Sequence, residues 1–167
     1  ALSRTWDVLL AFPSLFLAIL IVATFGRGFF PAVIALSICY IPFLARNVRG
    51  LTIVERNKPY VAAARLQGFG APRILGLHVL PNISGAVMAL LTLIFVYALL
   101  DLTALSFIGL GVRPPTSDWG SMMAEGKTTI LETVNPVIWP CVMVIVTVVC
   151  VNLVGDAIAA RIERGRR

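Results

Sequence analysis

Long uncharged, apolar runs alternate with short charged segments along this chain. Each run is close to the roughly 20 residues that a helix needs to cross about 30 Å of hydrocarbon. Because a backbone in lipid must satisfy its own hydrogen bonds, runs of this length are expected to be helices rather than open strands. The pattern predicts an all-α membrane protein with four transmembrane helices. The predicted spans cover residues 7–26, 28–45, 83–112 and 134–157 of a single domain, residues 1–167.

Composition agrees with this prediction. The mean hydropathy is +0.93, and 59% of the residues are apolar while 13% are charged. Soluble domains usually carry about 25% charged residues. Buried helices of a large soluble core are the alternative, and four long runs in succession favour the membrane over it.

The charges also orient the chain, which has a net charge of +6. If residues 46–82 are cytoplasmic, most basic side chains fall on the cytoplasmic side, as the positive-inside rule requires. The charge is thus a topology signal and needs no nucleic acid to explain it. The outer segment, residues 113–133, contains Lys127, and Arg27 and Arg113 also fall outside. The cytoplasmic set is Arg4, Arg46, Arg49, Arg56, Lys58, Arg65, Arg73, Arg161, Arg164, Arg166 and Arg167.

The first run begins after Arg4 and Asp7, without an initiator Met and without a small-residue cleavage site behind it. These features are typical of a true span and not of a signal peptide. We expect further spans to precede this one in the complete protein.

Cysteine and histidine usage indicates no redox or metal chemistry. The three cysteines, Cys39, Cys141 and Cys150, all lie in predicted spans, where apolar surroundings raise a thiol's pKa and keep it inert. An odd count argues against a disulfide framework. The single histidine, His78, has no cysteine or carboxylate at metal-ligand spacing, so no metal site is predicted.

Residues 120–128 end in Gly126-Lys127-Thr128 and look superficially like a phosphate-binding loop. That loop requires four residues between its glycines, and it follows a strand. Here five residues separate Gly120 from Gly126, and the segment lies on the outer side. We therefore predict that this chain binds no nucleotide itself.

The polar segment between the second and third runs has the features of two short helices. Pro59 suits a first helical turn, and the alanines after Tyr60 favour a helix to about Gln67. Residues 68–70 (Gly-Phe-Gly) should break it, and residues 71–72 can open a second helix to about Val79. Residues 80–82 (Leu-Pro-Asn) are then expected to turn the chain back into the membrane. From the residues alone, a partner-binding surface and an ordinary interfacial loop remain equal alternatives.

Two motifs resemble a known family. Residues 62–68 followed by Leu80-Pro81 are similar to the EAA loop of ABC-importer permeases. The second motif, residues 105–111 with 114–115 and 118–120, resembles the dipeptide, oligopeptide and nickel branch, specifically the second of its two permease subunits. A weaker third block covers residues 152–156, and the resemblance extends over essentially the whole chain.

This resemblance implies the core of a type I ABC-importer permease in the bacterial inner membrane. It is a transport subunit, not an enzyme, with the loop 46–82 and the C-terminus in the cytoplasm. The implied partners are a second permease subunit, two ATPase subunits that bind ATP and Mg, and an extracytoplasmic binding protein. No cofactor is expected in this chain. The implied ATPase-coupling residues are Tyr60, Ala62, Ala63, Ala64, Gly68, Leu80 and Pro81.

The chain departs from the family pattern at two positions. Ala62 replaces the glutamate that names the motif, and His78 replaces the usual isoleucine three residues before the proline. Ala62 still favours a helix, but the loss of the carboxylate leaves the transfer of a role to position 62 open.

Asp101 is a single acid in the middle of the third run. A charge at that depth must face protein or water. It is a candidate for the substrate path, where it would contact a peptide's amino terminus, or a structural residue that bonds to a neighbouring helix. The structural alternative is favoured, because a lone acid gives no partner.

The predicted function is inward transport of dipeptides or oligopeptides. A permease for nickel or another small solute is the alternative within the family. An intramembrane enzyme would require an ionisable pair or a Ser/His set in the spans, which offer Asp101 alone. A channel or exporter component is the third alternative.

Overall fold

The computed structural model describes residues 12–112 and 115–164. Every regular element in those two ranges is a helix, which confirms the predicted all-α class. The elements are α2 (Ser14–Phe25), α3 (Phe29–Arg56), α4 (Pro59–Leu66), α5 (Ala71–Ile74), a π-helical turn (Leu75–Val79), α6 (Leu80–Phe107), α7 (Trp119–Gly126), a 3₁₀ turn (Lys127–Thr129) and α8 (Asn135–Arg164).

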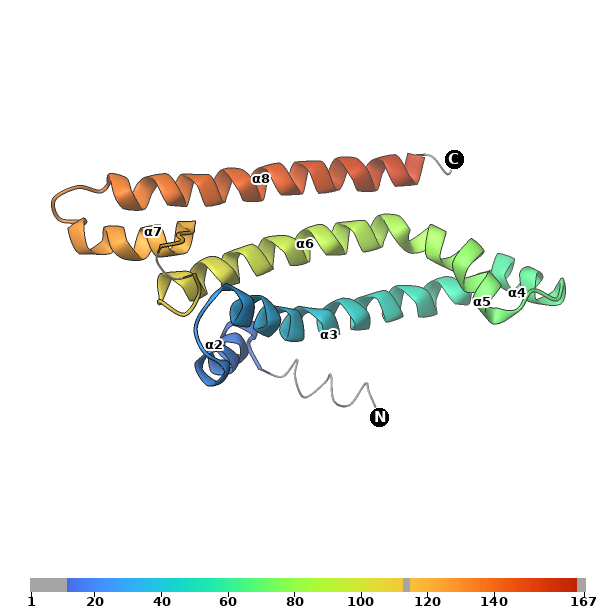
Figure 1. Ribbon diagram of the computed structural model, residues 1–167. Coiled ribbons are helices and arrows are strands. Elements are labelled where there is room, and N and C mark those ends of the chain that lie inside the picture. Colours follow the sequence, from blue (N-terminus) through green and yellow to red (C-terminus); the bar gives the residue numbers. More distant parts are fainter. Residues whose placement is uncertain (1–11, 113–114, 165–167) are drawn as a thin grey trace.

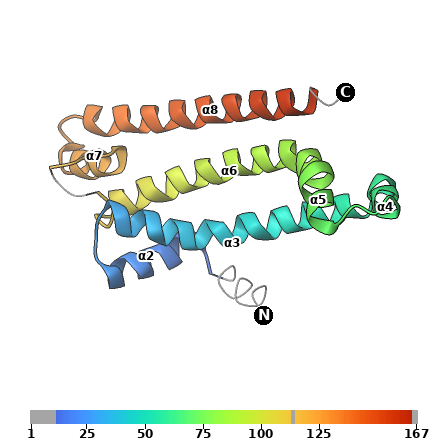
Figure 2. The same cartoon turned by 45° about the vertical axis from the view of Figure 1, so that its right-hand side comes forward.

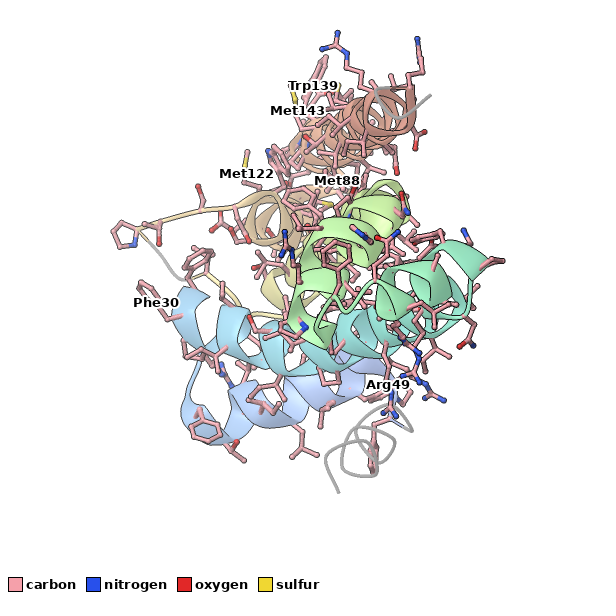
Figure 3. The ribbon with its side chains drawn as sticks, turned by 90° about the vertical axis from the view of Figure 1, so that its right-hand side faces the viewer. Phe30, Arg49, Met88, Met122, Trp139 and Met143 are labelled. Atoms are coloured by element: carbon pink, nitrogen blue, oxygen red, sulfur yellow. The ribbon has the colours of Figure 1, made fainter. Side chains whose placement is uncertain are left out.

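Three long helices, α3, α6 and α8, lie side by side, with α6 in the middle (Figure 1). By length and composition, each could cross a membrane. The outer side of α8 carries exposed apolar side chains such as Trp139 and Met143, labelled in Figure 3. Apolar surface of this kind suits lipid or another membrane subunit rather than water.

The predicted first span is described only from residue 12 onward. Its described part is α2, 12 residues long, which packs against the outer half of α3 through Ala18 and Val22. Residues 7–11 lie outside the described residues, so a full span at 7–26 stays a prediction. The second span was predicted to end near residue 45, whereas α3 continues to Arg56. Its last turns extend the helix into the segment assigned to the polar loop.

The C-terminal end of α6 explains the second sequence motif. Gly109 has φ +80°, and the chain closes with hydrogen bonds from Gly109 N to Ser106 O and from Leu110 N to Leu105 O. This pair of bonds is a Schellman motif, in which a left-handed residue ends the helix. A Cβ atom at Gly111 or Gly120 would overlap Ser106, so glycine at both positions allows the chain and α7 to close over the end of α6.

The contact between α6 and α8 depends on a glycine as well. A Cβ atom at Gly155 would overlap the side chain of Thr92. Small residues of this kind let two membrane helices approach closely. The weak third block of the sequence, residues 152–156, therefore contains a helix-packing position.

The return into the membrane differs from the predicted turn at residues 80–82. Helical structure is continuous from Ala71 to Phe107, and the chain bends at the π-helical turn, as Figure 2 shows. There the Leu80 N–H donates to the carbonyl of Leu75, five residues back. Such wide turns bend helices, and the next residue, Pro81, has no N–H to place. The chain thus changes direction without leaving the helix.

Candidate functional site

The segment from the end of α3 to the start of α6 forms one end of the molecule, and the end of α8 points toward the same side (Figure 1). The opposite end holds α7 and the connection to α8. This arrangement places the predicted loop and the C-terminal end of α8 on one side, as the charge asymmetry predicted. The residues that resemble a phosphate-binding loop lie at the other end, in α7 and the 3₁₀ turn that follows it.

One face of α4 is buried. Val61 and Ala64 pack with Ile74 and Val79 from the second helical segment, and Tyr60 and Phe69 cover the edge of this cluster. A shared apolar core of this kind makes α4, α5 and the π-helical turn pack as one unit.

The other face of α4 is open. Ala62 and Ala63 are exposed, and Leu66 is 91% exposed. The three predicted alanines therefore have different positions: Ala64 anchors the helix, while Ala62 and Ala63 lie on its surface. Small side chains beside a bare leucine leave this face flat and apolar, which permits close approach of a partner.

Gly68 ends α4 as the sequence predicted. Its φ is +83°, with hydrogen bonds from Gly68 N to Arg65 O and from Phe69 N to Ala64 O. These bonds form a second Schellman motif, with Phe69 packing back on the apolar cluster. The guanidinium of Arg73 lies 4.8 Å from the centroid of the Phe69 ring, a cation–π distance that fixes this ring further.

A polar network connects α4 to both long helices beside it. The Tyr60 hydroxyl donates to Glu55 Oε1 at 2.8 Å, and Asn82 Nδ2 donates to the Tyr60 oxygen at 2.8 Å. Glu55 belongs to α3 and Asn82 to α6, so Tyr60 bridges the two. Glu55 is 7% exposed, and buried carboxylates require such partners.

Lys58 completes the network. Its Nζ lies 2.8 Å from Glu55 Oε2, so the carboxylate is bonded at both oxygens. The hydrogen bond to Glu55 raises the pKa of the Lys58 ammonium. Burial raises the pKa of the Tyr60 hydroxyl, so the phenol stays protonated and continues to donate at neutral pH.

Leu80 and Pro81 form the first turn of α6, directly after the π-helical turn, and Leu80 is exposed while Pro81 is half-buried. Pro81 O accepts a 2.9 Å hydrogen bond from Ser84 Oγ. The coupling role that the resemblance implied for this pair stays a prediction.

Asp101 joins three helices. Its Oδ2 accepts hydrogen bonds from Ser14 Oγ of α2 at 3.0 Å and from the Tyr40 hydroxyl of α3 at 2.7 Å. The Cys39 thiol also lies 3.5 Å from the Ser14 carbonyl oxygen, as a weak donor. Asp101 therefore bonds to two neighbouring helices, while its role, in the path or in the structure alone, stays a prediction.

No group of three His, Cys, Asp or Glu side chains that could hold a metal ion occurs within residues 12–112 and 115–164. The three cysteines are free thiols. The described part of the chain thus offers a hydrogen-bonded connection between α3, α4 and α6 and an exposed apolar face on α4.

Comparison with known families decides the identity. Residues 1–167 match the family described as binding-protein-dependent transport system inner membrane component. The chain belongs to this family. It is therefore a multi-pass component of a transport system in the inner membrane and not an enzyme, as the resemblance implied.

Individual members of this transport family are similar over most of the chain. The Di/tripeptide transport system permease protein DppC of Pseudomonas aeruginosa is 41% identical over 93% of this chain and 51% of its own length. A putative peptide transport system permease protein of Brucella suis is 39% identical over 94% and 53%. The glutathione transport system permease protein GsiD of Salmonella typhimurium is 36% identical over 93% and 51%. The chain spans about half the length of these relatives.

A solved structure shows the same fold. The chain superposes with a TM-score of 0.77 on a chain of the MetNI methionine ABC transporter in an inward-facing conformation, at 16% sequence identity. The match covers 96% of this chain and 73% of the other. The two chains thus share one fold over essentially all of the sequence described here.

Sequence reasoning about this family member missed two residues of the network. Glu55 was absent from the predicted site, and Asn82 appeared only as a turn residue. Glu55 precedes Tyr60 by five residues, and the break between α3 and α4 lies between them. Whether the two side chains meet depends on the angle between these helices, which the sequence does not give. Ala62 is exposed, while Glu55 at the end of α3 is the carboxylate that bonds to Tyr60, and a coupling role for position 62 stays a prediction.

Proposed function

We propose that this chain is part of the permease subunit of an ATP-driven importer that moves dipeptides or oligopeptides across the bacterial inner membrane. Relatives at 36–41% identity carry names that specify peptide or glutathione transport, and glutathione is itself a tripeptide. The partners in this proposal are a second permease subunit, two ATPase subunits that bind ATP and Mg, and an extracytoplasmic binding protein.

The exposed face of α4 docks on an ATPase subunit in this proposal. Ala62, Ala63 and Leu66 supply a flat apolar surface, and the Schellman turn at Gly68 fixes where the helix ends. Closure of the ATPase dimer around ATP would displace α4 as a body, because its other face is packed into the cluster of Val61 and Ala64.

The observation that carries the proposal is the Glu55–Tyr60–Asn82 network. A displacement of α4 reaches α3 through Glu55 and α6 through Asn82 at the same time. Rigid-body movement of packed helices is an established way to switch a protein between two states. The two flanking helices would then move together and open the path to one side of the membrane.

Uptake of labelled peptide tests the proposal. The complete protein, with its partner subunits and binding protein, is expressed in cells that lack their own peptide importers. We expect ATP-dependent accumulation of di- and tripeptides that is lost when this subunit is omitted. Accumulation of nickel with no peptide uptake would favour the alternative cargo, and ATP-independent flux would favour a channel.

A further inference from the structure

Two neighbouring cavities form one hollow on a single side of the α3–α6 pair. The upper cavity, which is the one beside α2, has a volume of about 290 Å³ and is lined by Ser14, Tyr40, Phe43 and Tyr97 among others. The lower one, of about 820 Å³, opens next to it and shares Phe43. The combined hollow, called the polar hollow below, leads from the Asp101 network toward the end of the molecule that carries α4.

The polar hollow follows one face of each helix. On α3 its lining advances by one helical turn at a time, from Tyr40 through Phe43 and Asn47 to Gly50. On α6 it runs from Tyr97 to Leu90 at a spacing of two turns. Residues three, four or seven apart share a helix face, so the two cavities line one continuous surface.

A negative group, Asp101, is bonded to two residues that line the upper end of the polar hollow, although it is not itself among the lining residues. Ser14 and Tyr40, which both line the hollow, bond to the same oxygen of Asp101, Oδ2. The second oxygen accepts no hydrogen bond, and Asp101 has no cationic partner, within residues 12–112 and 115–164. Asp101 is also one turn beyond Tyr97, on the same face of α6. An ionisable residue at membrane depth is a functional-site hypothesis by default, and a carboxylate is the group that a bound cation would face.

A positive group lies at the lower end. Arg46 lines the lower cavity beside Asn47 and Gly50. A guanidinium has five N–H donors in a planar fork that matches a carboxylate. Its donors allow a bound carboxylate in addition to other contacts of the side chain.

The length of the polar hollow is compatible with a short peptide. Tyr40, which bonds to Asp101, and Arg46 are six residues apart on α3, so their backbones differ in height by about 9 Å along the helix axis. An extended chain covers about 3.3–3.6 Å per residue, so a di- or tripeptide spans roughly 7–11 Å, and the long Arg46 side chain can adjust to that length.

We propose that the polar hollow binds a zwitterionic di- or tripeptide, with Asp101 facing its ammonium group and Arg46 facing its carboxylate. This assignment rests on the proposed function and names the surface of this chain that the peptide contacts on its way through the membrane. A second groove of about 540 Å³ along α3 and α6 shares Tyr40 with the polar hollow and is otherwise lined mainly by apolar residues such as Val33 and Phe95. No charged side chain is among its described lining residues, so it offers no charge to either end of a zwitterion.

Photo-crosslinking in the complete transporter tests the assignment. A tripeptide with a photoreactive side chain is delivered by the binding protein under turnover, and the labelled residues are located by mass spectrometry. We expect adducts on Phe43, Tyr97 or Gly50. Adducts confined to the apolar groove, for example on Phe95, would overturn the assignment, as would transport of the probe with no adduct on the polar hollow.

Charge variants sharpen this test. Asp101→Asn and Arg46→Gln should each reduce adduct yield at Phe43 by about tenfold, the weak end of measured couplings between close charge pairs. Arg49→Gln is the matched control, because Arg49 is exposed like Arg46 but is absent from the lining of the hollow; it should leave the yield unchanged. Equal yields in all three variants would overturn the charge assignment.

The wild-type assembly separates this inference from the function on which it rests. If the unmodified transporter accumulates no peptide, the proposed function is contradicted. If it accumulates the probe and the adducts lie elsewhere, only the polar hollow is contradicted. Should Asp101→Asn fail to assemble, the positions of the wild-type adducts and the Arg46→Gln variant still decide.

Discussion

The Tyr60 hydroxyl lies 2.8 Å from Glu55 Oε1 across the break between α4 and α3. The Tyr60 hydroxyl oxygen also accepts a hydrogen bond from Asn82 of α6. One phenol thus fixes a short helix against two long helices that meet nowhere else in this network. In the proposed importer, this is the point at which movement of α4 becomes movement of the membrane helices.

Replacing Tyr60 with Phe keeps the ring and removes the hydroxyl's bonds to Glu55 and Asn82, along with its longer 3.5 Å contact to the His78 carbonyl. Because this leaves one oxygen of the buried Glu55 without a donor, we expect a loss of about 1–3 kcal/mol in local stability. Peptide uptake should fall severalfold, while the ATPase subunits remain bound and continue to hydrolyse ATP. Uptake and ATP hydrolysis measured on the same vesicles check this uncoupling.

Asn82→Ala provides the matched comparison. It removes one of the two bonds and should reduce uptake less than Tyr60→Phe does. The double variant should resemble Tyr60→Phe alone, because both changes break one network. Additive losses in uptake would show that the two residues act separately.

Gly68 and Gly76 form a matched pair within the same segment. An added Cβ meets nothing within 4 Å at either position, but only Gly68 has a left-handed backbone, with φ +83°. Gly68→Ala should cost about 1–2 kcal/mol and lower uptake, whereas Gly76→Ala should be neutral. Limited proteolysis of residues 59–79 and uptake assays measure both. Equal behaviour of the two variants would refute the role of the Schellman turn.

Gly68→Pro is the stronger change. Proline cannot adopt a positive φ and removes the N–H that bonds to Arg65 O. We expect insertion into the membrane at normal levels and uptake near background. Normal import by this variant would mean that the end of α4 has no part in coupling.

Gly155→Ala should separate α8 from α6. The new Cβ would overlap Thr92, and overpacking of this kind typically costs about 1–3 kcal/mol. Thermal unfolding in detergent should show the loss, and adding Thr92→Ala should restore part of it. If Gly155→Ala alone leaves the melting temperature unchanged, the close contact of the two helices is not required.

Lys58 should matter less than Tyr60. Lys58 bonds to Glu55 alone, whereas Tyr60 also reaches α6, and because the Lys58 side chain is 52% exposed, water screens its half of the ion pair. Its pKa is raised from an ordinary 10.5, so its contribution is fully present below that pH and is lost as pH rises through the higher folded value. We therefore expect Lys58→Met to have a small effect that is constant from about pH 6 to 9. A marked change in uptake across that range, specific to wild type, would contradict this.

The sequence predicts the parts of this fold that depend on local rules. Long uncharged runs predict the long helices, Pro59 predicts where α4 begins, and Gly68 predicts where it ends. It does not predict the bend, since the π-helical turn at Leu75–Val79 has no local marker apart from the nearby Pro81.

Contacts between distant residues were beyond sequence reasoning. Glu55 and Asn82 are 27 residues apart in the chain and meet at Tyr60 only because α3 and α6 flank α4. Likewise, the helix period alone does not say which of Ala62, Ala63 and Ala64 faces inward. That choice is set by the apolar cluster of Ile74 and Val79.

Disulfide crosslinking from α4 tests the central claim most directly. In a background with Cys39, Cys141 and Cys150 replaced, a cysteine is placed at exposed Ala63 or, as a control, at Ala64, which is 4% exposed. The complete transporter in native membranes, with single cysteines along the ATPase surface, is then oxidised. The account predicts a crosslink from position 63 to an ATPase subunit, with a yield that changes on ATP binding, and none from position 64. Failure of position 63 to reach an ATPase subunit, or its labelling from outside the cell, would contradict the account.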